Sequence, residues 1–365
     1  DLSFQKLNDK YYAIIIDDLL KKKILFNGRP TRRVKYSVGF DNDGKLLGIE
    51  YEWFTDTGCN DNGSLAHILS NFLDGAYKCD NYFIKLFALK TNKSSCTEMR
   101  SPDMMPSMSF NEFIIEHIAS HLRKDPFEVR QRNLYKRNDV ALGNRVLDDF
   151  NLPEILSDFL ISSRYYERKR EIDDFNRRNK WKKRGISLTL LKYPITHKLG
   201  YYNIVVSIHR ADGSVSVSGG GVEIGQGIHT KMAQCCAYEL GVPIDKIKVK
   251  PMNSHVNPNA AFTAASATTD LACKGVYECV KVLHERLQPI KEKMKPNYTW
   301  EELIETAFSE ACQLTALYFV GPEKLIDSYS TYYTYGCACS EVIVDVLTGE
   351  LEIVKSEMTY DCGQS

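Results

Sequence analysis

Two spacings of apolar residues recur along this chain, and together they predict hairpins interleaved with helices. Period-two alternation around short turns predicts β-hairpins at residues 34–54, 203–218 and 337–358, with further strands at 83–89, 185–191 and 246–249. Apolar residues three and four apart predict helices at residues 110–123, 126–135, 153–180, 230–240, 271–288 and 298–319, and an amphipathic helix within residues 1–28. Because the strands and helices do not follow a regular βαβ order, the pattern indicates an α+β fold.

Two of these helices carry more local information. Asp125 is suited to cap the helix at 126–135, with Pro126 at its first position and Glu128 three residues after the cap. The helical stretch at 153–180 mixes Arg, Glu and Asp along its length, and mixed signs are typical of a solvated helix face rather than a binding tail.

Length, composition and charge narrow the class of protein. The 365 residues predict two to three domains, and 43% hydrophobic residues are enough for a buried core. Lys+Arg and Asp+Glu balance at 47 each, so the charge does not favour a nucleic-acid partner. No apolar run reaches the roughly 18 residues of a membrane span. The apolar stretch at 11–20 contains Asp17 and Asp18 and is followed, not preceded, by lysines, which argues against a signal peptide. Since the chain runs from Asp1 to Ser365 without a starting Met or a terminal helix, we expect a fragment of a longer protein.

The chain has 11 cysteines, an odd number without a spaced framework, which predicts reduced thiols in a cytoplasmic protein. Cys337 and Cys339 would share one face of a strand and so could share a metal. Because no second pair of ligands follows at a matching spacing, buried thiols are the favoured interpretation.

A glycine turn, residues 219–231, joins a predicted strand to a predicted helix and reads Gly-Gly-Gly-Val-Glu-Ile-Gly-Gln-Gly-Ile-His-Thr-Lys. Its glycines leave backbone N–H groups uncovered near a helix N-terminus, an arrangement that accepts phosphate oxygens or another anionic or polar ligand edge. The turn matches neither the dinucleotide pattern G-x-G-x-x-G nor the Walker pattern, which disfavours a nucleotide-phosphate binder. On this pattern alone, a tight turn without any ligand is an equal alternative.

A small-residue loop, residues 257–270, precedes the predicted helix at 271–288. Its side chains are small enough for a ligand to approach the main chain, and Ser266, Thr268 and Thr269 add hydroxyl donors. Residue types alone favour a simpler interpretation, in which the loop only caps the next helix through Thr269 or Asp270.

An arginine bend, residues 96–102, lies before the predicted helix at 110–123. Most single arginines are surface ion-pair partners. In a loop that leads to a helix, Arg100 could instead hold an anionic or oxo ligand with its forked donors, and residue types alone leave both interpretations open.

Taken in order, these motifs resemble the molybdenum-cofactor region of the xanthine dehydrogenase/aldehyde oxidase family. The resemblance rests on the arginine bend, the glycine turn, the run Thr263-Ala264-Ala265-Ser266 and the segment Tyr335-Gly336-Cys337-Ala338-Cys339-Ser340-Glu341-Val342. Residues 125–135 are also similar to a family stretch that ends in Arg-x-x-Asn-Leu-Tyr. The similarity covers about residues 29–365. The bend around Arg100 looks closer to the Cys-Arg-Ala-Pro of insect aldehyde oxidases than to the Phe-Arg-Gly-Phe of the dehydrogenases.

The resemblance implies two mixed α/β-hairpin subdomains of a molybdopterin-binding region. Residues 1–28 would be an atypical N-terminal segment, 29–140 part of the first molybdopterin-binding domain and 141–365 part of the second. It also implies a molybdenum–molybdopterin cofactor whose metal is held by the pterin sulfurs, so no protein side chain is expected to ligate the metal. By motif match, the cofactor-binding residues would be Arg100, Ile224, Gly225, Gln226, Ala264, Ala265, Ser266 and Thr268.

The family reaction would be hydroxylation of an aldehyde or an N-heterocycle with water as oxygen donor and a glutamate as general base. The family is usually homodimeric and passes electrons through iron–sulfur clusters to FAD. This chain has no cysteine pattern for such clusters and no flavin domain, so we expect both only in the full-length parent. In the family the general base lies beyond the segment that here reads Asp361-Cys362-Gly363. The catalytic residues therefore stay unassigned, neither Glu223 nor Glu341 is given the role, and the chain alone is expected to be inactive.

A second hypothesis from another class is a degenerate, non-catalytic paralogue that binds no cofactor. The chain departs from the family pattern at two places. Pro102 stands where the dehydrogenases have a substrate-stacking phenylalanine, and residues 1–28 do not match the family's equivalent stretch.

Overall fold

The computed structural model describes residues 28–60, 72–97, 100–197, 200–321 and 332–363, together with two short strands, β1 (Gln5–Lys6) and β2 (Ala13–Ile15). The chain divides into two compact units, which we describe separately. The first unit contains residues 1–194 and 327–365, and the second contains residues 195–326. Each unit has its own core of buried apolar side chains.

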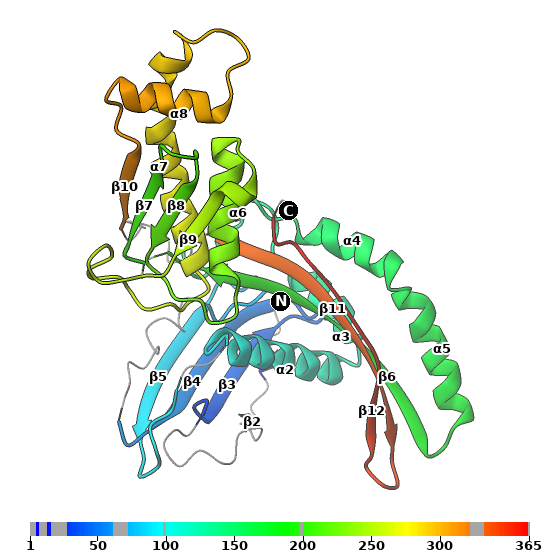
Figure 1. Ribbon diagram of the computed structural model, residues 1–365. Helices are drawn as coiled ribbons and strands as arrows, with labels where there is room; N and C mark the ends of the chain where they lie inside the picture. The colour runs from blue at the N-terminus through cyan, green and yellow to red at the C-terminus, as the bar shows by residue number, and fades with distance from the viewer. Residues whose placement is uncertain are drawn as a thin grey trace. The chain divides into compact units, whose positions relative to one another are not determined.

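A mixed sheet forms one part of the first unit (Figure 1). Its strands are β1, β2, β3 (Arg32–Phe40), β4 (Leu46–Gly58) and β5 (Tyr82–Lys90). The predicted hairpin is confirmed, since β3 and β4 pair antiparallel, and β5 adds parallel to β4. Helix α2 (Met104–Leu122) packs on this sheet, and Trp53 and Phe110 meet edge to face with ring centroids 5.0 Å apart. Helix α3 (Pro126–Asn133) follows and begins as predicted, because the Asp125 carboxylate accepts the N–H of Phe127 at 2.8 Å.

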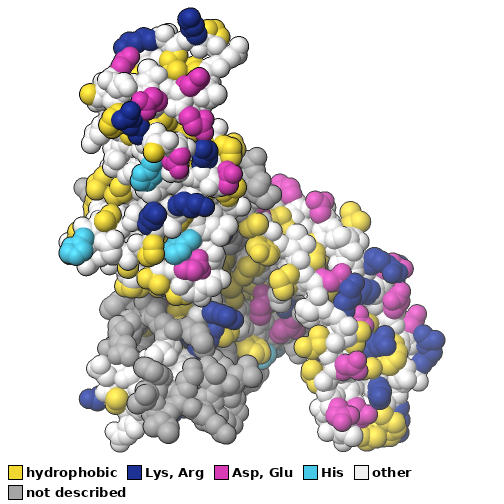
Figure 2. Space-filling view, in the orientation of Figure 1, with side chains coloured by type: hydrophobic (Ala, Val, Ile, Leu, Met, Phe, Trp, Pro, Cys, Tyr) yellow, Lys and Arg dark blue, Asp and Glu magenta, His cyan; other side chains and the backbone are white. Residues whose placement is uncertain are grey.

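A three-stranded sheet forms the other part of the first unit. It has the order β12 (Leu351–Tyr360), β11 (Tyr332–Asp345), β6 (Lys182–Ile195), and β11 and β12 form the predicted C-terminal hairpin. Helices α4 (Leu152–Ser162) and α5 (Tyr165–Arg178) run beside these strands (Figure 1). Basic and acidic side chains intermix over the exposed surface of α5 (Figure 2), in agreement with the predicted solvated face.

The second unit contains a four-stranded sheet with two helices on one face (Figure 1). The strand order is β10 (Thr315–Val320), β7 (Tyr202–Ile208), β8 (Val215–Gly219), β9 (Ile247–Lys250). Helices α6 (Ile228–Leu240) and α7 (Thr268–Lys291) cover the buried side chains of β7 and β8, the short 3₁₀ helix η2 (Ile244–Lys246) leads into β9, and α8 (Trp300–Ser309) follows α7 in the chain. Helix α7 lies very close to β7 at Gly275, where an added Cβ would stand 2.3 Å from Ile204 Cγ1.

The structure corrects three predicted elements. The helix predicted at 298–319 ends at Ser309, and β10 follows, because Ala316 and Val320 are buried while Leu317 and Phe319 are exposed, a period-two pattern that pairs with β7. The single helix predicted at 153–180 is broken at Arg164, which has φ 53°. Within residues 1–28, where a helix was predicted, β1 and β2 pair with β3, and residues 1–4, 7–12 and 16–27 lie outside the described residues. The α+β class itself is confirmed.

Candidate cofactor-binding site

The glycine turn connects β8 to α6 in the second unit, as the sequence predicts. Gly221, Gly225 and Gly227 have φ values of 106°, 99° and 79°, a region of backbone conformation that side-chain-bearing residues rarely adopt. Gly227 is the residue that precedes α6. The glycines are therefore needed for the course of the chain, whether or not a ligand binds there.

Two side chains of the turn fold back and fix its backbone. The amide of Gln226 accepts the N–H of Ile224 at 2.7 Å and donates to the carbonyl of Val222 at 2.8 Å. The Glu223 carboxylate accepts the N–H groups of Gly225 and Gly227, both at 2.9 Å. The hydrogen bond from Gly227 lowers the pKa of Glu223, burial opposes it, and the hydrogen bonds from Gly225 and His229 lower the pKa further. Because a depressed carboxyl pKa favours the ionised form, these bonds persist above the ordinary glutamate range and are lost only as the pH falls through the lowered value.

The small-residue loop leads into α7 in the same unit. Ala265 and Ser266 both adopt left-handed φ values, 60° and 57°, which is uncommon for residues with a side chain. Residues Ala264, Ala265 and Ser266 are exposed. In the described part of the chain, their backbone N–H groups donate to no protein acceptor. This strained loop therefore presents three N–H groups to a ligand beside the N-terminus of α7.

The two loops are neighbours in the second unit. The Thr263 hydroxyl accepts the N–H of Val222 at 2.8 Å, which links the small-residue loop to the glycine turn directly. At Gly221 an added Cβ would lie 2.9 Å from Thr268 Cγ2, so the Gly221 backbone packs closely against the Thr268 side chain. The Tyr202 hydroxyl of β7 donates to the Phe262 carbonyl at 3.1 Å and lies 3.2 Å from Thr268 Oγ1. Seven of the eight sequence-predicted site residues thus belong to two segments in contact.

The side chains of those seven residues differ in what they offer. Ile224 is 72% exposed and flanks the turn. Thr268 is buried, and its hydroxyl contacts the Tyr202 hydroxyl, so its side chain stabilises the loop. Gln226 is engaged within its own turn. The atoms presented to a ligand are therefore mainly backbone N–H groups, with Ser266 adding an exposed hydroxyl.

Replacing Thr263 by valine is expected to loosen the junction of the two loops. The Val222 N–H then loses its acceptor, and a lost hydrogen bond of this kind costs about 1 kcal/mol. We expect amide hydrogen exchange at residues 220–227 to become about fivefold faster. Thr263→Ser keeps the hydroxyl and is the matched control. Equal exchange in both variants would show that the bond does not hold the turn.

Arg100 lies in the first unit, in the bend before α2. Arg100 and Ser101 have φ values of 33° and 54°, and Arg29 holds the bend by donating to the Arg100 carbonyl at 2.6 Å. A buried ion pair between Arg32 of β3 and Asp103, the residue before α2, stabilises the start of that helix. The Arg100 side chain itself is exposed. Since the two units are described separately, its action together with the second-unit loops stays a prediction.

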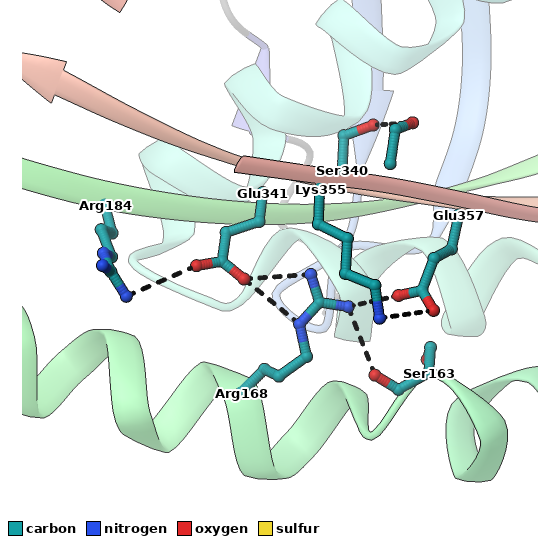
Figure 3. A network of polar contacts seen from close by, with 8 residues as sticks. Ser163, Arg168, Arg184, Ser340, Glu341, Lys355 and Glu357 are labelled. Carbon is teal, nitrogen blue, oxygen red and sulfur yellow. Dashed lines mark hydrogen bonds and ion pairs between the residues drawn. The ribbon is translucent and has the colours of Figure 1, made fainter. Parts of the chain in front are cut away.

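The two glutamates that the sequence analysis left unassigned both have structural partners. Glu223 binds the backbone of its own turn. Glu341 on β11 is 7% exposed and accepts two hydrogen bonds from Arg168 of α5, at 3.0 and 3.2 Å, with Arg184 also 3.8 Å away (Figure 3). Arg168 donates at 2.7 Å to Glu357 of β12 as well. This network fixes α5 to the β11–β12 hairpin and gives Glu341 a structural role.

Several contributors were missed by sequence reasoning. Tyr202, Arg29 and Arg32 support the predicted motifs but lie far from them in the chain, and only pairing in space reveals them. His197, two residues after the end of β6, contacts Asp270 of α7 at 3.3 Å between Nε2 and Oδ2. None of the helices in the described ranges is long and apolar enough to cross a membrane.

Comparison with known families places the chain. Residues 17–134 and residues 159–365 each match a "molybdopterin cofactor-binding domain". The chain is 35% identical over 354 residues to xanthine dehydrogenase/oxidase of Rattus norvegicus, 36% over 345 residues to xanthine dehydrogenase of Calliphora vicina, and 37% over 357 residues to probable aldehyde oxidase 2 of Oryza sativa. These alignments cover 94%, 91% and 94% of this chain and 26%, 25% and 26% of the relatives.

The chain belongs to the xanthine dehydrogenase/aldehyde oxidase family and carries its molybdopterin-binding domains. It spans about a quarter of the length of the curated relatives it matches. Because relatives of similar identity bear both names, the likeness of the arginine bend to insect aldehyde oxidases stays a prediction. The division between the two domains near residue 140 also stays a prediction.

Solved structures show the same fold. Quinoline 2-oxidoreductase from Pseudomonas putida 86 aligns with a TM-score of 0.79 at 19% identity and covers 92% of this chain and 48% of that one. Aldehyde oxidoreductase from Desulfovibrio gigas aligns with a TM-score of 0.71 at 21% identity and covers 91% and 37%. This confirms the predicted architecture of a molybdenum-cofactor-binding region.

The residues present fit a molybdopterin. A pterin with a phosphate ester needs hydrogen-bond donors for its phosphate and a narrow, backbone-lined cleft for its ring edge. The unused N–H groups of Ala264, Ala265 and Ser266 supply donors beside the start of α7. In the glycine turn, an added Cβ at Gly225 would meet nothing within 4 Å, so the backbone of the turn is uncovered there.

Proposed function

We propose that this chain forms the molybdopterin-binding portion of a molybdenum hydroxylase that oxidises aldehydes or N-heterocycles with water as oxygen donor. The observation that carries the proposal is the contact between the glycine turn and the small-residue loop, which sets unused N–H donors beside a helix N-terminus. The family membership of the chain and the names of its relatives, xanthine dehydrogenase and aldehyde oxidase, support the substrate class.

In this proposal the small-residue loop holds the phosphate end of the cofactor. Ala264, Ala265 and Ser266 donate through their backbone N–H groups, and the dipole of α7 adds positive potential at the same place. The hydroxyl contacts of Thr268 and Tyr202 fix the position of the loop. No side-chain cation is needed there, which agrees with the exposed alanines.

The glycine turn lines the other side of the cofactor. Ile224 and Gly225 face the ligand with an apolar side chain and a bare backbone. Gln226 keeps the turn closed. When bound, the cofactor supplies a metal that accepts two electrons from the substrate carbon. Arg100 contributes a forked donor for anionic or oxo groups of the same cofactor, a role that rests on its motif match.

The whole protein has further parts in this proposal. The general base, the iron–sulfur clusters, FAD and a homodimer partner would be supplied outside the described residues, and the assembled enzyme would be cytoplasmic. The rest of each relative, about three quarters of its length, leaves room for them.

Isotope transfer tests the reaction class. The holoenzyme that contains this chain is incubated with one aldehyde or one N-heterocycle in H₂¹⁸O, and the product is analysed by mass spectrometry. We expect the new oxygen to come from water, with a mass gain of about two units in nearly all product. Product that takes its oxygen from ¹⁸O₂ in unlabelled water, or a cofactor-loaded enzyme that hydroxylates neither substrate class, would overturn the proposal.

A further inference from the structure

Two cysteines, Cys235 of α6 and Cys273 of α7, are in contact in the second unit. Cys235 Sγ lies 3.6 Å from the carbonyl oxygen of Cys273, 38 residues along the chain. Both residues are partly exposed. The pair therefore combines proximity with access to a reagent from solution.

The other described cysteines lack this combination. Cys79, Cys96, Cys236, Cys279, Cys337 and Cys339 are buried, and Cys59 and Cys362 are exposed. Cys312 is partly exposed, but its thiol contacts the Arg286 carbonyl, 3.7 Å away. Cys236 is next to Cys235 in sequence, yet it points into the core and has 0% exposure. It is therefore a natural internal control.

The surroundings favour Cys235 as the attacking sulfur. The hydrogen bond from the Cys273 thiol lowers the pKa of Cys235, against the opposing effects of burial and of Glu239. The same bond raises the pKa of Cys273. Burial and the charges of Cys235 and Asp270 raise this pKa further, and Lys231 lowers it. A thiolate is the nucleophile in thiol–disulfide exchange, so reaction begins at Cys235.

We propose that Cys235 and Cys273 form a reversible disulfide site that tethers α6 to α7, with a low-molecular-weight disulfide as oxidant. The Cys235 thiolate attacks one sulfur of the oxidant, breaks its S–S bond and releases one small thiolate. Cys273 then loses its proton, and its sulfur attacks Cys235, which expels the second small thiolate. Two protein thiols are oxidised, one small disulfide is reduced to two thiols, and a small reducing thiol reverses the process.

The position of the tether gives it a structural consequence. Helix α6 begins directly after the glycine turn, and α7 begins directly after the small-residue loop. A bond between the eighth residue of α6 and the sixth of α7 fixes the separation of the helices that carry both loops. This inference does not depend on the proposed function, since it concerns the protein without any cofactor.

Peptide mapping tests the site. The purified full chain is incubated with oxidised glutathione, remaining thiols are alkylated, and the trypsin digest is read by mass spectrometry without reduction. We expect a cross-linked pair of peptides 232–246 and 249–274 that dithiothreitol separates. The pair should be absent from Cys235→Ser and from Cys273→Ser and should persist in Cys236→Ser. Free alkylation of both thiols in oxidised wild type, persistence in Cys235→Ser, or loss in Cys236→Ser would each overturn the assignment.

A thermal scan tests the tether. Closing a loop of this length restricts the unfolded chain, so the oxidised wild type should melt about 5–10 °C higher than its reduced form. Cys235→Ser should show no such difference between the two conditions. A cross-linked wild type that melts at the reduced temperature would contradict the claim that the bond holds the helices together.

Discussion

Gly221→Ala is expected to lower the molybdopterin content of the protein by about tenfold or more. The residue has φ 106°, and an added Cβ would stand 2.9 Å from both Ile228 Cδ1 and Thr268 Cγ2. Backbone strain at such a position costs about 1–3 kcal/mol, and the contacts push the glycine turn away from the start of α7. Since about 1.4 kcal/mol is tenfold in an equilibrium constant, the cofactor affinity should fall at least that far.

Gly241→Ala is the matched control for this substitution. Gly241 ends α6 with φ 71°, and an added Cβ there would meet nothing within 4 Å. It therefore carries conformational strain without crowding, at about 1 kcal/mol of stability. We expect its pterin content to equal that of wild type when both are purified at a temperature well below unfolding. Equal losses in the two variants would indicate general destabilisation rather than separation of the loops.

Lys192→Met is expected to destabilise the first unit by about 3–5 kcal/mol, the cost of leaving a buried charge without its partner. Lys192 Nζ and Asp74 Oδ2 lie 2.8 Å apart, with side-chain exposures of 2% and 1%. The same carboxylate oxygen accepts the Tyr135 hydroxyl at 2.9 Å and the Leu142 N–H at 3.1 Å. Burial lowers the pKa of Lys192, and Asp74 acts in the opposite direction. The lysine thus serves to neutralise a carboxylate that organises the unit.

The double variant Lys192→Met with Asp74→Asn separates charge from packing. The asparagine oxygen can still accept from Tyr135 and Leu142, and no charge stays buried. We expect it to recover most of the lost stability, as measured by urea dependence of hydrogen exchange in peptides from β6 and β11, which belong to the first unit. A double variant as unstable as the single one would show that the ammonium is needed for something other than neutralisation.

The motifs of the candidate site were predictable from the sequence because each is local. The strand-to-helix turn requires positive φ at residues 221, 225 and 227. Because glycine is the residue that adopts such values readily, the glycines in the sequence predict the turn. The small-residue loop is similar, since alanines and hydroxyl residues before a helix leave the backbone accessible. The order of the motifs then identified the family, and the comparisons confirm that identification.

Other features were not predictable because they depend on partners distant in sequence. The edge strand β10 was taken for the end of a helix, since only its pairing with β7 distinguishes Leu317 and Phe319 as an exposed strand face. The break at Arg164 has no proline or glycine to announce it. Nor do residue types reveal that Thr263 binds Val222 or that Gln226 is engaged within its own turn.

The cofactor load of the purified chain tests the central claim most directly. The full chain is co-produced with the molybdopterin biosynthetic enzymes, and molybdenum by mass spectrometry and pterin by fluorescence after oxidation are measured on the same folded sample. The two loops of the second unit predict molybdenum and pterin in equal amounts, approaching one of each per chain, and a fall of about tenfold in Gly221→Ala. A folded wild-type chain that carries neither would contradict the account and favour a paralogue that has lost its cofactor.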